Sequence, residues 1–201
     1  TGCGKSTVIN LIPRFYDTTE GEVLVDGVNV RDYTQKDLRN KIGYVSQKAT
    51  LFTGTIRSNV AYGDNGKNPA SVDEVNRAVA IAQASEFVDG LEDGCDAYVA
   101  QGGANFSGGQ KQRLSIARAI ARKPEILIFD DSFSALDYKT DRILRQTLAK
   151  ECKDSTRIIV AQRIGTIRDA DRIIVLEDGK IAGMGRHEEL MQNCEVYQQI
   201  A

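Results

Sequence analysis

The sequence has 201 residues, of which 41% are hydrophobic and 27% charged, and its formal net charge at pH 7 is −2. Such values are ordinary for globular proteins, and the length suffices for one hydrophobic core, alone or with a small subdomain. The near-neutral charge gives no support to nucleic acid or an anionic membrane surface as the main partner. No apolar run approaches the ~20 residues of a membrane span, and no signal peptide is recognisable. We therefore expect a cytosolic chain without membrane insertion of its own.

The cysteines are scattered along the chain, without a C-x-x-C pair: Cys3, Cys95, Cys152 and Cys194. The single histidine, His187, cannot supply a zinc cluster together with them. Reduced thiols in a cytosolic protein are the expectation that follows.

The chain begins with Thr1-Gly2-Cys3-Gly4-Lys5-Ser6-Thr7, which matches the second half of a phosphate-binding loop, G-x-x-x-x-G-K-[ST]. Glycines in such a loop let backbone N–H groups turn toward a polyphosphate. Lys5 is expected to reach the β- and γ-phosphates, and the Ser6 hydroxyl to bind Mg²⁺. The helix expected over residues 5–12 would point its positive N-terminus at the anion. The first glycine of the pattern and the strand before it would precede residue 1. The alternative is a glycine-rich turn before a helix.

The next part of the chain predicts a hairpin, a strand and a helical region. Asp26-Gly27 lies between short apolar runs in residues 21–30, which predicts a β-hairpin in a second, antiparallel sheet. Residues 42–47 form a buried strand ending at Gln47, whose amide is either a strand-end cap or a ligand of Mg²⁺ or water at the γ-phosphate. The capping-box sequence over residues 71–74 predicts an amphipathic helix from residue 75 to about 84. The helical region would continue to about residue 94, and residues 96–104 are expected to be loop.

A second glycine-rich segment, residues 105–113, has the sequence Asn-Phe-Ser-Gly-Gly-Gln-Lys-Gln-Arg and precedes a helix expected over residues 114–122. The Ser107 hydroxyl and the free N–H groups of Gly108 and Gly109 at a helix N-terminus would make a second anion-binding arrangement. The alternative is a serine N-cap with a glycine-rich turn. Two phosphate-sized sites in one chain suggest that one of them serves the other copy of a dimer.

Residues 126–129 are wholly apolar, as in a buried parallel strand, and end at Asp130-Asp131. Carboxylates at the C-terminal end of such a strand lie where open α/β sheets bind ligands. The remaining elements expected in order are a helix from Asp137 to about residue 150, a strand over 157–161 ending at Gln162, a short helix, a strand over 172–176, a turn and strand around 178–180, and a C-terminal helix from residue 187. This alternation predicts an α/β fold with a mainly parallel sheet.

Five motifs, in this order, resemble the nucleotide-binding domain of ABC transporters. They are the phosphate loop or Walker A (Gly4-Lys5-Ser6), the Q-loop glutamine Gln47, the signature (Asn105 to Gln110), the Walker B strand (Ile126 to Asp130) and the D-loop (Ser134 to Asp137). The signature in its long form, continuing to Arg113, is highly specific, and the resemblance covers essentially the whole chain. Other details resemble the exporter branch: Asp37-Leu38-Arg39, residues 51–56 and the segment around His187.

The resemblance implies one ABC-type ATP-binding domain over residues 1–201, beginning inside Walker A. It implies a P-loop NTPase core of RecA type, an antiparallel β subdomain and an α-helical signature subdomain at about residues 55–122. ATP and Mg²⁺ are the implied cofactors. The implied metal ligands are Ser6, Gln47 and Asp130. The implied nucleotide contacts are Thr1, Gly2, Cys3, Gly4, Lys5, Ser6, Thr7, Gln47, Ser107, Gly108, Gly109, Gln110 and Asp137.

The resemblance also implies partners. Two such domains close head-to-tail around two ATP molecules, each held between the phosphate loop of one domain and the signature of the other. Closure drives the transmembrane domain of an exporter from inward-facing to outward-facing, and hydrolysis resets it. The chain would thus work at the cytoplasmic side of the cell membrane, and residues 71–94 and the groove by Gln47 would receive coupling helices from the transmembrane domain.

Two positions depart from the family pattern. Asp131 stands where the family usually has the glutamate that polarises the attacking water, and its carboxylate is withdrawn by one methylene, about 1.5 Å. Gln162 stands where the family usually has a histidine at the γ-phosphate, and an amide cannot carry a positive charge. Loss of a general base typically costs ~10²–10⁴ in rate. With Gln47, these are the predicted catalytic residues of a site that binds ATP and rarely hydrolyses it.

An intact signature beside such a site resembles one half of a heterodimeric exporter of multidrug or lipid type, whose partner is a different chain. The alternatives are a homodimeric exporter in which Asp131 suffices, a non-transport ABC clamp, and a purely regulatory nucleotide-binding module. A clamp would usually carry long coiled-coil insertions or tandem domains and a charge suited to nucleic acid, which this sequence lacks. Gln101 also stands where many exporters have glutamate, which could alter cross-talk with the membrane helices.

Overall fold

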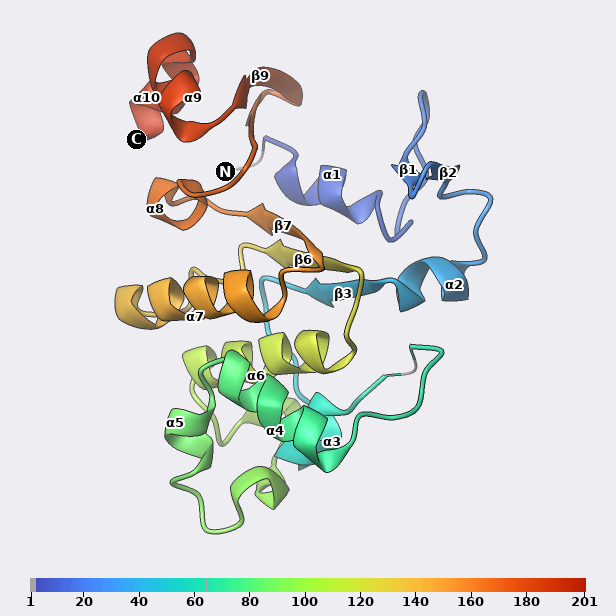
Figure 1. The fold of residues 1–201 in the computed structure, drawn as a ribbon, viewed down its shortest axis with the longest axis vertical. Coiled ribbons are helices and arrows are strands. Elements are labelled where there is room, and N and C mark those ends of the chain that lie inside the picture. Colours follow the sequence, from blue (N-terminus) through green and yellow to red (C-terminus); the bar gives the residue numbers. More distant parts are fainter. Residues whose placement is uncertain (1–2, 64) are drawn as a thin grey trace.

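The computed structural model describes residues 3–63 and 65–201, and its centre is a three-stranded parallel sheet (Figure 1). The strands β3 (Ile42–Val45), β6 (Ile126–Asp130) and β7 (Thr156–Val160) lie in the order β3-β6-β7. Because the strands are parallel and Asp130 pairs in register with Val160, their carboxyl ends meet at one edge of the sheet. The predicted α/β fold with a parallel core sheet is confirmed.

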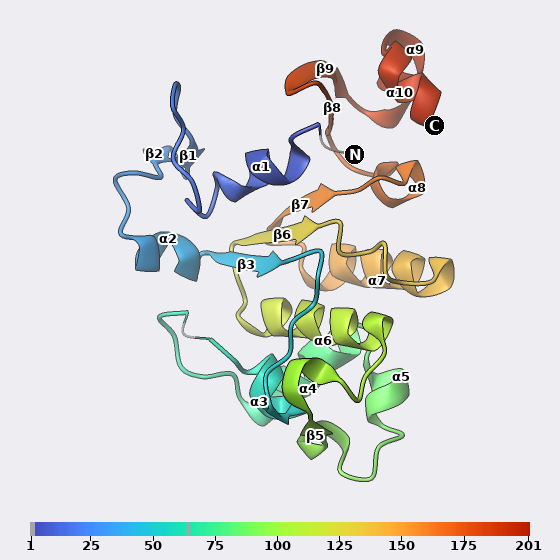
Figure 2. The same ribbon diagram turned by 180° about the vertical axis from the view of Figure 1, so that it is seen from behind.

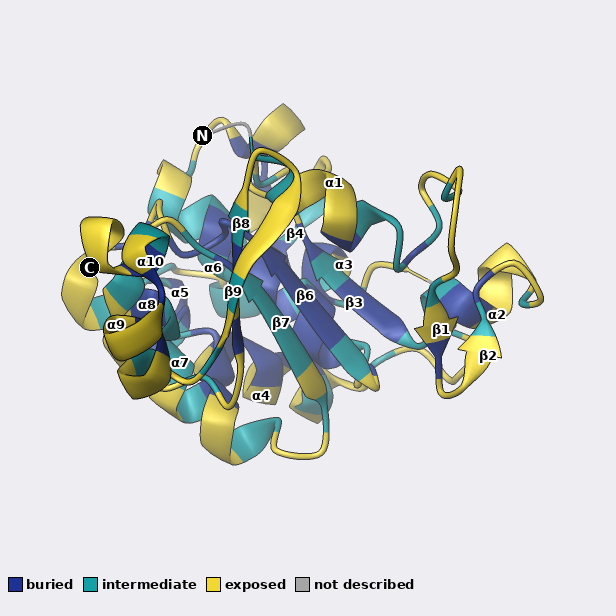
Figure 3. Cartoon of the chain, turned by 90° about the horizontal axis from the view of Figure 1, so that it is seen from above, coloured by how far each residue is buried: buried dark blue, intermediate teal, exposed yellow. Residues whose placement is uncertain are grey.

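The two faces of this sheet are covered by different helices, as Figures 1 and 2 show. Successive side chains of a strand point to opposite faces. Ile128 accordingly packs with Ile9 of α1 (Lys5–Asn10), whereas Phe129 packs with Leu114 of α6 (Gly108–Ala121) and Leu144 of α7 (Tyr138–Glu151). Figure 3 shows the strands as the buried centre between these layers. Burial on both faces explains the wholly apolar sequence of β6.

A small antiparallel hairpin, β1 (Leu24–Val25) with β2 (Val28–Asn29), lies beyond the C-terminal end of α1 (Figure 1). Its turn, Asp26-Gly27, has φ of 52° and 76°, the geometry of the tight hairpin turn that Asp-Gly favours. The predicted hairpin is therefore confirmed. It leads to α2 (Gln35–Asn40), whose N-terminus is capped by the side chain of Thr34.

The segment between β3 and β6 is mainly helical and packs around α6. It contains β4 (Gly54–Thr55), α3 (Ile56–Val60), α4 (Val72–Ile81), α5 (Ser85–Val88) and β5 (Tyr98–Val99), with 3₁₀ turns at Gly94–Asp96 and Gln101–Gly103. The predicted capping box is present, but α4 begins at Val72 directly after the cap rather than at residue 75. Residues 96–104 are not simply loop, because β5 pairs antiparallel with β4.

The start of α6 also differs from the prediction. The helix begins at Gly108, six residues before Leu114, because Ser107 caps it and two glycines enter the first turn despite their low helix propensity. The C-terminal part contains α8 (Ile164–Ile167), β8 (Ile173–Glu177) and β9 (Lys180–Gly185), with β8 and β9 paired antiparallel. The sequence predicted a single C-terminal helix, whereas the structure has two, α9 (His187–Asn193) and α10 (Glu195–Ile200). The extended backbone of Cys194 separates them. In the described part of the chain, every helix is too short or too polar to span a bilayer.

Candidate functional site

The predicted phosphate loop leads directly into α1. Gly4 has φ of 91°, a left-handed conformation that L side chains rarely adopt, so the backbone geometry itself calls for glycine here. The Lys5 ammonium donates to the Cys3 thiol, with 3.1 Å between Nζ and Sγ, and this hydrogen bond lowers the pKa of Cys3. Thr1 and Gly2, which also belong to the predicted loop, lie outside the described residues.

The loop and the Walker B strand meet through Ser6 and Asp130. The Ser6 hydroxyl donates to Asp130 across 124 residues of sequence, with 2.8 Å between Oγ and Oδ1. The Tyr44 hydroxyl lies 3.3 Å from Oδ2 of the same carboxylate and 2.8 Å from Oδ1 of Asn10. Burial and the negative charge of Asp130 raise the pKa of Tyr44. A hydroxyl and a carboxylate side by side are the hard oxygen donors that Mg²⁺ takes, so these residues fit the predicted metal site.

The three predicted catalytic residues meet at the side chain of Asp131. Oδ2 of Asp131 accepts the Gln47 amide at 3.1 Å and the Gln162 amide at 2.9 Å, both through Nε2. The Asp131 backbone has φ of 47° and donates its N–H to the carbonyl of Val160 at 3.0 Å. Aspartate is among the few residues that tolerate this left-handed conformation well. The ends of three adjacent strands thus hold one carboxylate between two amides.

The signature turn is a capped helix start. Ser107 accepts the Gln110 backbone N–H on Oγ at 3.2 Å, and the Gln110 side chain accepts the Ser107 N–H at 2.9 Å. This reciprocal capping box fixes the turn and leaves Ser107 and Gly108 exposed. A Cβ on Gly109 would lie 3.4 Å from the carbonyl oxygen of Ala135, so the glycine faces the D-loop. The Gln110 amide oxygen is therefore engaged within the helix start.

Asp137, the last residue of the predicted D-loop, is the N-cap of α7. Its Oδ1 accepts the Thr140 N–H at 2.9 Å, and hydrogen bonds from Thr140 lower the pKa of its carboxyl. The cap gives Asp137 a local structural role in addition to the predicted nucleotide contact.

Sequence reasoning missed two buried polar side chains behind this site. Gln112 is 1% exposed and donates to the Ser46 carbonyl, with 3.1 Å from Nε2 to O. Ser132 is fully buried and donates to the carbonyl of Val45 at 2.8 Å. A signal for Gln112 existed, because it lies four residues before the buried Ile116 and so falls on the core face of α6. Both residues hold the backbone immediately before Gln47.

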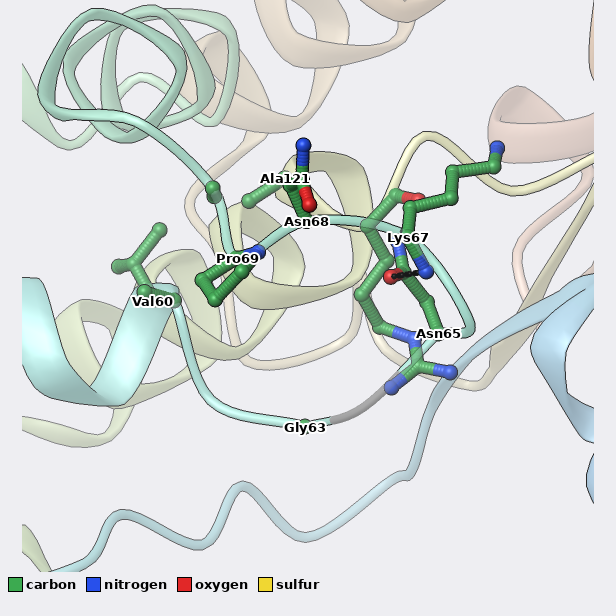
Figure 4. A pocket seen from close by; sticks show the side chains of 10 residues that line it. Val60, Gly63, Asn65, Lys67, Asn68, Pro69 and Ala121 are labelled. Atoms are coloured by element: carbon green, nitrogen blue, oxygen red, sulfur yellow. Dashed lines mark hydrogen bonds between the residues drawn. The ribbon is translucent and has the colours of Figure 1, made fainter.

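A cavity of about 320 Å³ lies at the other end of α6 and is separate from this site (Figure 4). It is lined by the end of α3, the segment after α3 and the last turn of α6, including Val60, Lys67 and Ala121. Asn65 shapes it by donating to the Arg122 carbonyl at 2.8 Å and accepting the Lys67 backbone N–H at 3.0 Å. None of the predicted site residues lines it. The signature lies at the start of α6 and the cavity at its end, and a 14-residue helix is about 20 Å long.

Comparison with known proteins identifies the family to which the sequence and fold of this chain are similar. The profile of the family described as "ABC transporter" matches residues 1–134. The ATP-dependent lipid A-core flippase of Mannheimia succiniciproducens is 44% identical over 200 residues, which cover 100% of this chain and 34% of that protein. ABC transporter B family member 21 of Arabidopsis thaliana is 46% identical over 195 residues, covering 97% of this chain and 15% of that protein.

A solved structure shows the same fold. The structure of a bacterial Atm1-family ABC exporter with ATP bound aligns with a TM-score of 0.94 and 40% sequence identity, over 100% of this chain and 35% of that chain. The chain thus spans about a third of the flippase and of the exporter, and less of the plant protein.

Proposed function

Because the chain belongs to the ABC transporter family, we propose that it is the ATPase domain that powers export through a membrane transporter. Its cofactors are ATP and Mg²⁺, as in the ATP-binding domains of this family. The backbone of the phosphate loop and Lys5 would bind the phosphates, while Ser6, Gln47 and Asp130 would hold Mg²⁺, which supplies charge neutralisation at the phosphates. In this proposal residues 1–201 are one domain with its signature subdomain at about residues 55–122.

We propose that the chain's own site binds ATP and hydrolyses it slowly. The observation that carries this proposal is the engagement of one oxygen of Asp131 by both Gln47 and Gln162. Asp131 stands at the position of the predicted general base, but its side chain is short and its Oδ2 accepts two amide donors. Gln162 supplies a neutral N–H donor and cannot carry a proton through the reaction as an imidazole would. Both features lower the rate of water activation, while Lys5 and the backbone of the phosphate loop remain available to bind the phosphates.

The exposed signature supports a head-to-tail partner. Ser107 and Gly108 present a hydroxyl and unobstructed backbone at the start of a 14-residue helix, held in shape by Gln110. We propose that this surface completes the ATP site of a second ABC domain, and that the partner is a different chain whose own site is competent. The resulting transporter would be a heterodimeric exporter of multidrug or lipid type.

A second surface supports docking of a transmembrane domain. A groove of about 240 Å³ is lined by three aromatic residues, Phe15, Tyr44 and Tyr62, and by arginines that include Arg39 and Arg118. Arg118 donates to the Thr50 carbonyl at 2.9 Å, which ties the groove to the segment after Gln47. Aromatic and arginine side chains are enriched where proteins dock. We propose that a coupling helix lies here, with further contacts at residues 71–94, which places the chain at the cytoplasmic side of the cell membrane.

The experiment that tests this function measures ATP binding and steady-state turnover on the full-length subunit, alone and assembled with its second ATPase subunit. We expect the subunit on its own to bind ATP without turning it over, and the assembly to turn ATP over briskly. Brisk turnover by the subunit alone would contradict the slow-site proposal and would identify a homodimeric exporter with Asp131 as the active carboxylate. Lys5→Ala, which removes the phosphate-binding ammonium, should abolish binding at this site.

A further inference from the structure

Gln112 is a buried amide that makes a hydrogen bond to the backbone just before Gln47. Its side chain is 1% exposed and lies on the same face of α6 as the buried Ile116, four residues further along the helix. Burying an amide without a partner costs free energy, so an apolar residue would serve packing alone better. Its amide N–H donates to the backbone carbonyl of Ser46, which directly precedes Gln47.

Three successive residues at the end of β3 each make a hydrogen bond to a side chain of the site. The Val45 carbonyl accepts Ser132 Oγ at 2.8 Å, the Ser46 carbonyl accepts Gln112 Nε2 at 3.1 Å, and Gln47 itself donates to Asp131 at 3.1 Å. Ser132 and Asp131 are adjacent in sequence and follow β6, so two of the three contacts come from the Walker B segment. Only the contact of Gln112 reaches another element, the helix α6.

General attachment of α6 to this region does not depend on Gln112. Arg118, further along the same helix, donates to the Thr50 carbonyl and to the Asn59 carbonyl and side chain, at 2.8 to 2.9 Å. Gln112 adds a contact at one point only, one residue before Gln47. It also lies about one and a half helical turns from Ser107, the exposed cap of the same helix.

We infer that Gln112 is a positioning residue, which fixes the backbone before Gln47 and thereby links the signature helix to the Mg²⁺ side of the chain's own ATP site. A displacement of α6 moves the Ser46 carbonyl with it and changes where the Gln47 amide lies relative to Asp131. The inference rests on the proposed function, in which Gln47 is a ligand of the nucleotide-bound Mg²⁺. It adds a route by which a nucleotide at the signature of this chain changes metal binding at the phosphate loop of the same chain.

The test is a double-mutant cycle on the full-length subunit, with ATP affinity measured both in Mg²⁺ and in EDTA. Gln112→Met keeps the side-chain length and removes the donor. We expect it to weaken ATP binding in Mg²⁺ by roughly 3- to 10-fold, the factor that one neutral hydrogen bond supplies, and to leave binding in EDTA within about twofold. In a Gln47→Met background, Gln112→Met should add no further loss, because its effect passes through Gln47.

The matched control is Ser115→Ala, which alters a buried polar residue on the same helix whose Oγ has no hydrogen-bond partner. It should leave both affinities unchanged. If Gln112→Met prevents folding, Gln112→Asn withdraws the donor by about 1.5 Å and is compared in the same way. Equal losses in Mg²⁺ and EDTA, additive losses with Gln47→Met, or no loss would each overturn the inference. Lys5→Ala, measured in parallel, separates the two proposals: if it leaves ATP binding intact, the proposed function itself is wrong.

Discussion

Gln162 donates its side-chain amide to Oδ2 of Asp131 at 2.9 Å, across the ends of two neighbouring parallel strands. The contact follows from the register, because Asp130 pairs with Val160 and the residues just beyond both strands meet at the same edge. The amide holds the carboxylate and offers no titratable proton. The two departures from the family pattern are therefore one structural unit, and they should be reversed together.

Restoring both side chains should activate the site. The double variant Asp131→Glu with Gln162→His returns the longer carboxylate and the imidazole, so we expect ATP turnover of the full-length subunit alone to rise by ~10² or more. Steady-state phosphate release measures this. Adding Lys5→Ala to the double variant should abolish the gain, because Lys5 is predicted to bind the phosphates. An unchanged rate in the double variant would show that Asp131 and Gln162 do not limit hydrolysis.

Ser107→Arg should stop hydrolysis at the partner's site and leave nucleotide bound to this chain's own phosphate loop. The arginine places bulk and positive charge on the exposed signature turn, while the cap lost from α6 costs only ~0.5–2 kcal/mol. ATP turnover of the assembled transporter, together with photolabelling of this chain by an ATP analogue, measures both effects.

Thr34→Arg is the matched control for this signature variant. Thr34 caps α2 by accepting the Asp37 backbone N–H on its hydroxyl at 3.1 Å, and it lies outside the signature and the proposed docking surfaces. It should lose the same capping energy and keep turnover within about twofold of the wild type. Equal turnover in Ser107→Arg and the wild type would rule out head-to-tail assembly for this protein.

The sequence predicted that Gln47, Asp131 and Gln162 belong to one site, and the structure brings them together because each lies at the end of a strand. Gln47, Asp131 and Gln162 each follow an apolar run typical of a buried parallel strand, and such ends meet at one edge of a sheet. Gln112 and Ser132 could not be placed in this way, since each donates to a backbone carbonyl. Every residue carries a carbonyl, so no sequence pattern marks the acceptor.

The misplaced helix start has a similar cause. Glycine disfavours helix, and residues 108 and 109 therefore indicated a turn before the helix. The reciprocal bonds between Ser107 and Gln110 outweigh that preference locally. The strand β5 was missed because two residues hold too little pattern, and its pairing with β4 depends on the tertiary fold.

Cys3 should react faster than Cys95 and Cys152 at pH 7.5. The hydrogen bond from Lys5 lowers its pKa, whereas burial raises the pKa of Cys95 and of Cys152. A lower pKa leaves more of the reactive thiolate at a given pH, so the labelling rate of Cys3 should exceed the other two and level off at lower pH. Mass spectrometry after timed iodoacetamide treatment gives all three rates in one sample. Bound ATP should protect Cys3 and leave Cys95 unaffected, and labelling that ATP does not slow would place Cys3 outside the nucleotide site.

Alanine variants of Ser132 and Ser115 should differ in stability, because one buried hydroxyl is hydrogen-bonded and the other is not. Ser132 is fully buried and donates to the Val45 carbonyl at 2.8 Å, whereas the buried hydroxyl of Ser115 on α6 has no partner. Ser132→Ala should destabilise the protein by about 1–2 kcal/mol, because the bond is lost at a buried carbonyl. Ser115→Ala should be neutral or stabilising, since it removes a polar group that burial penalises. Unfolding midpoints of the two variants under the same conditions measure the difference, and a midpoint for Ser132→Ala at or above that of Ser115→Ala would show that the Ser132 bond does not stabilise the end of β3.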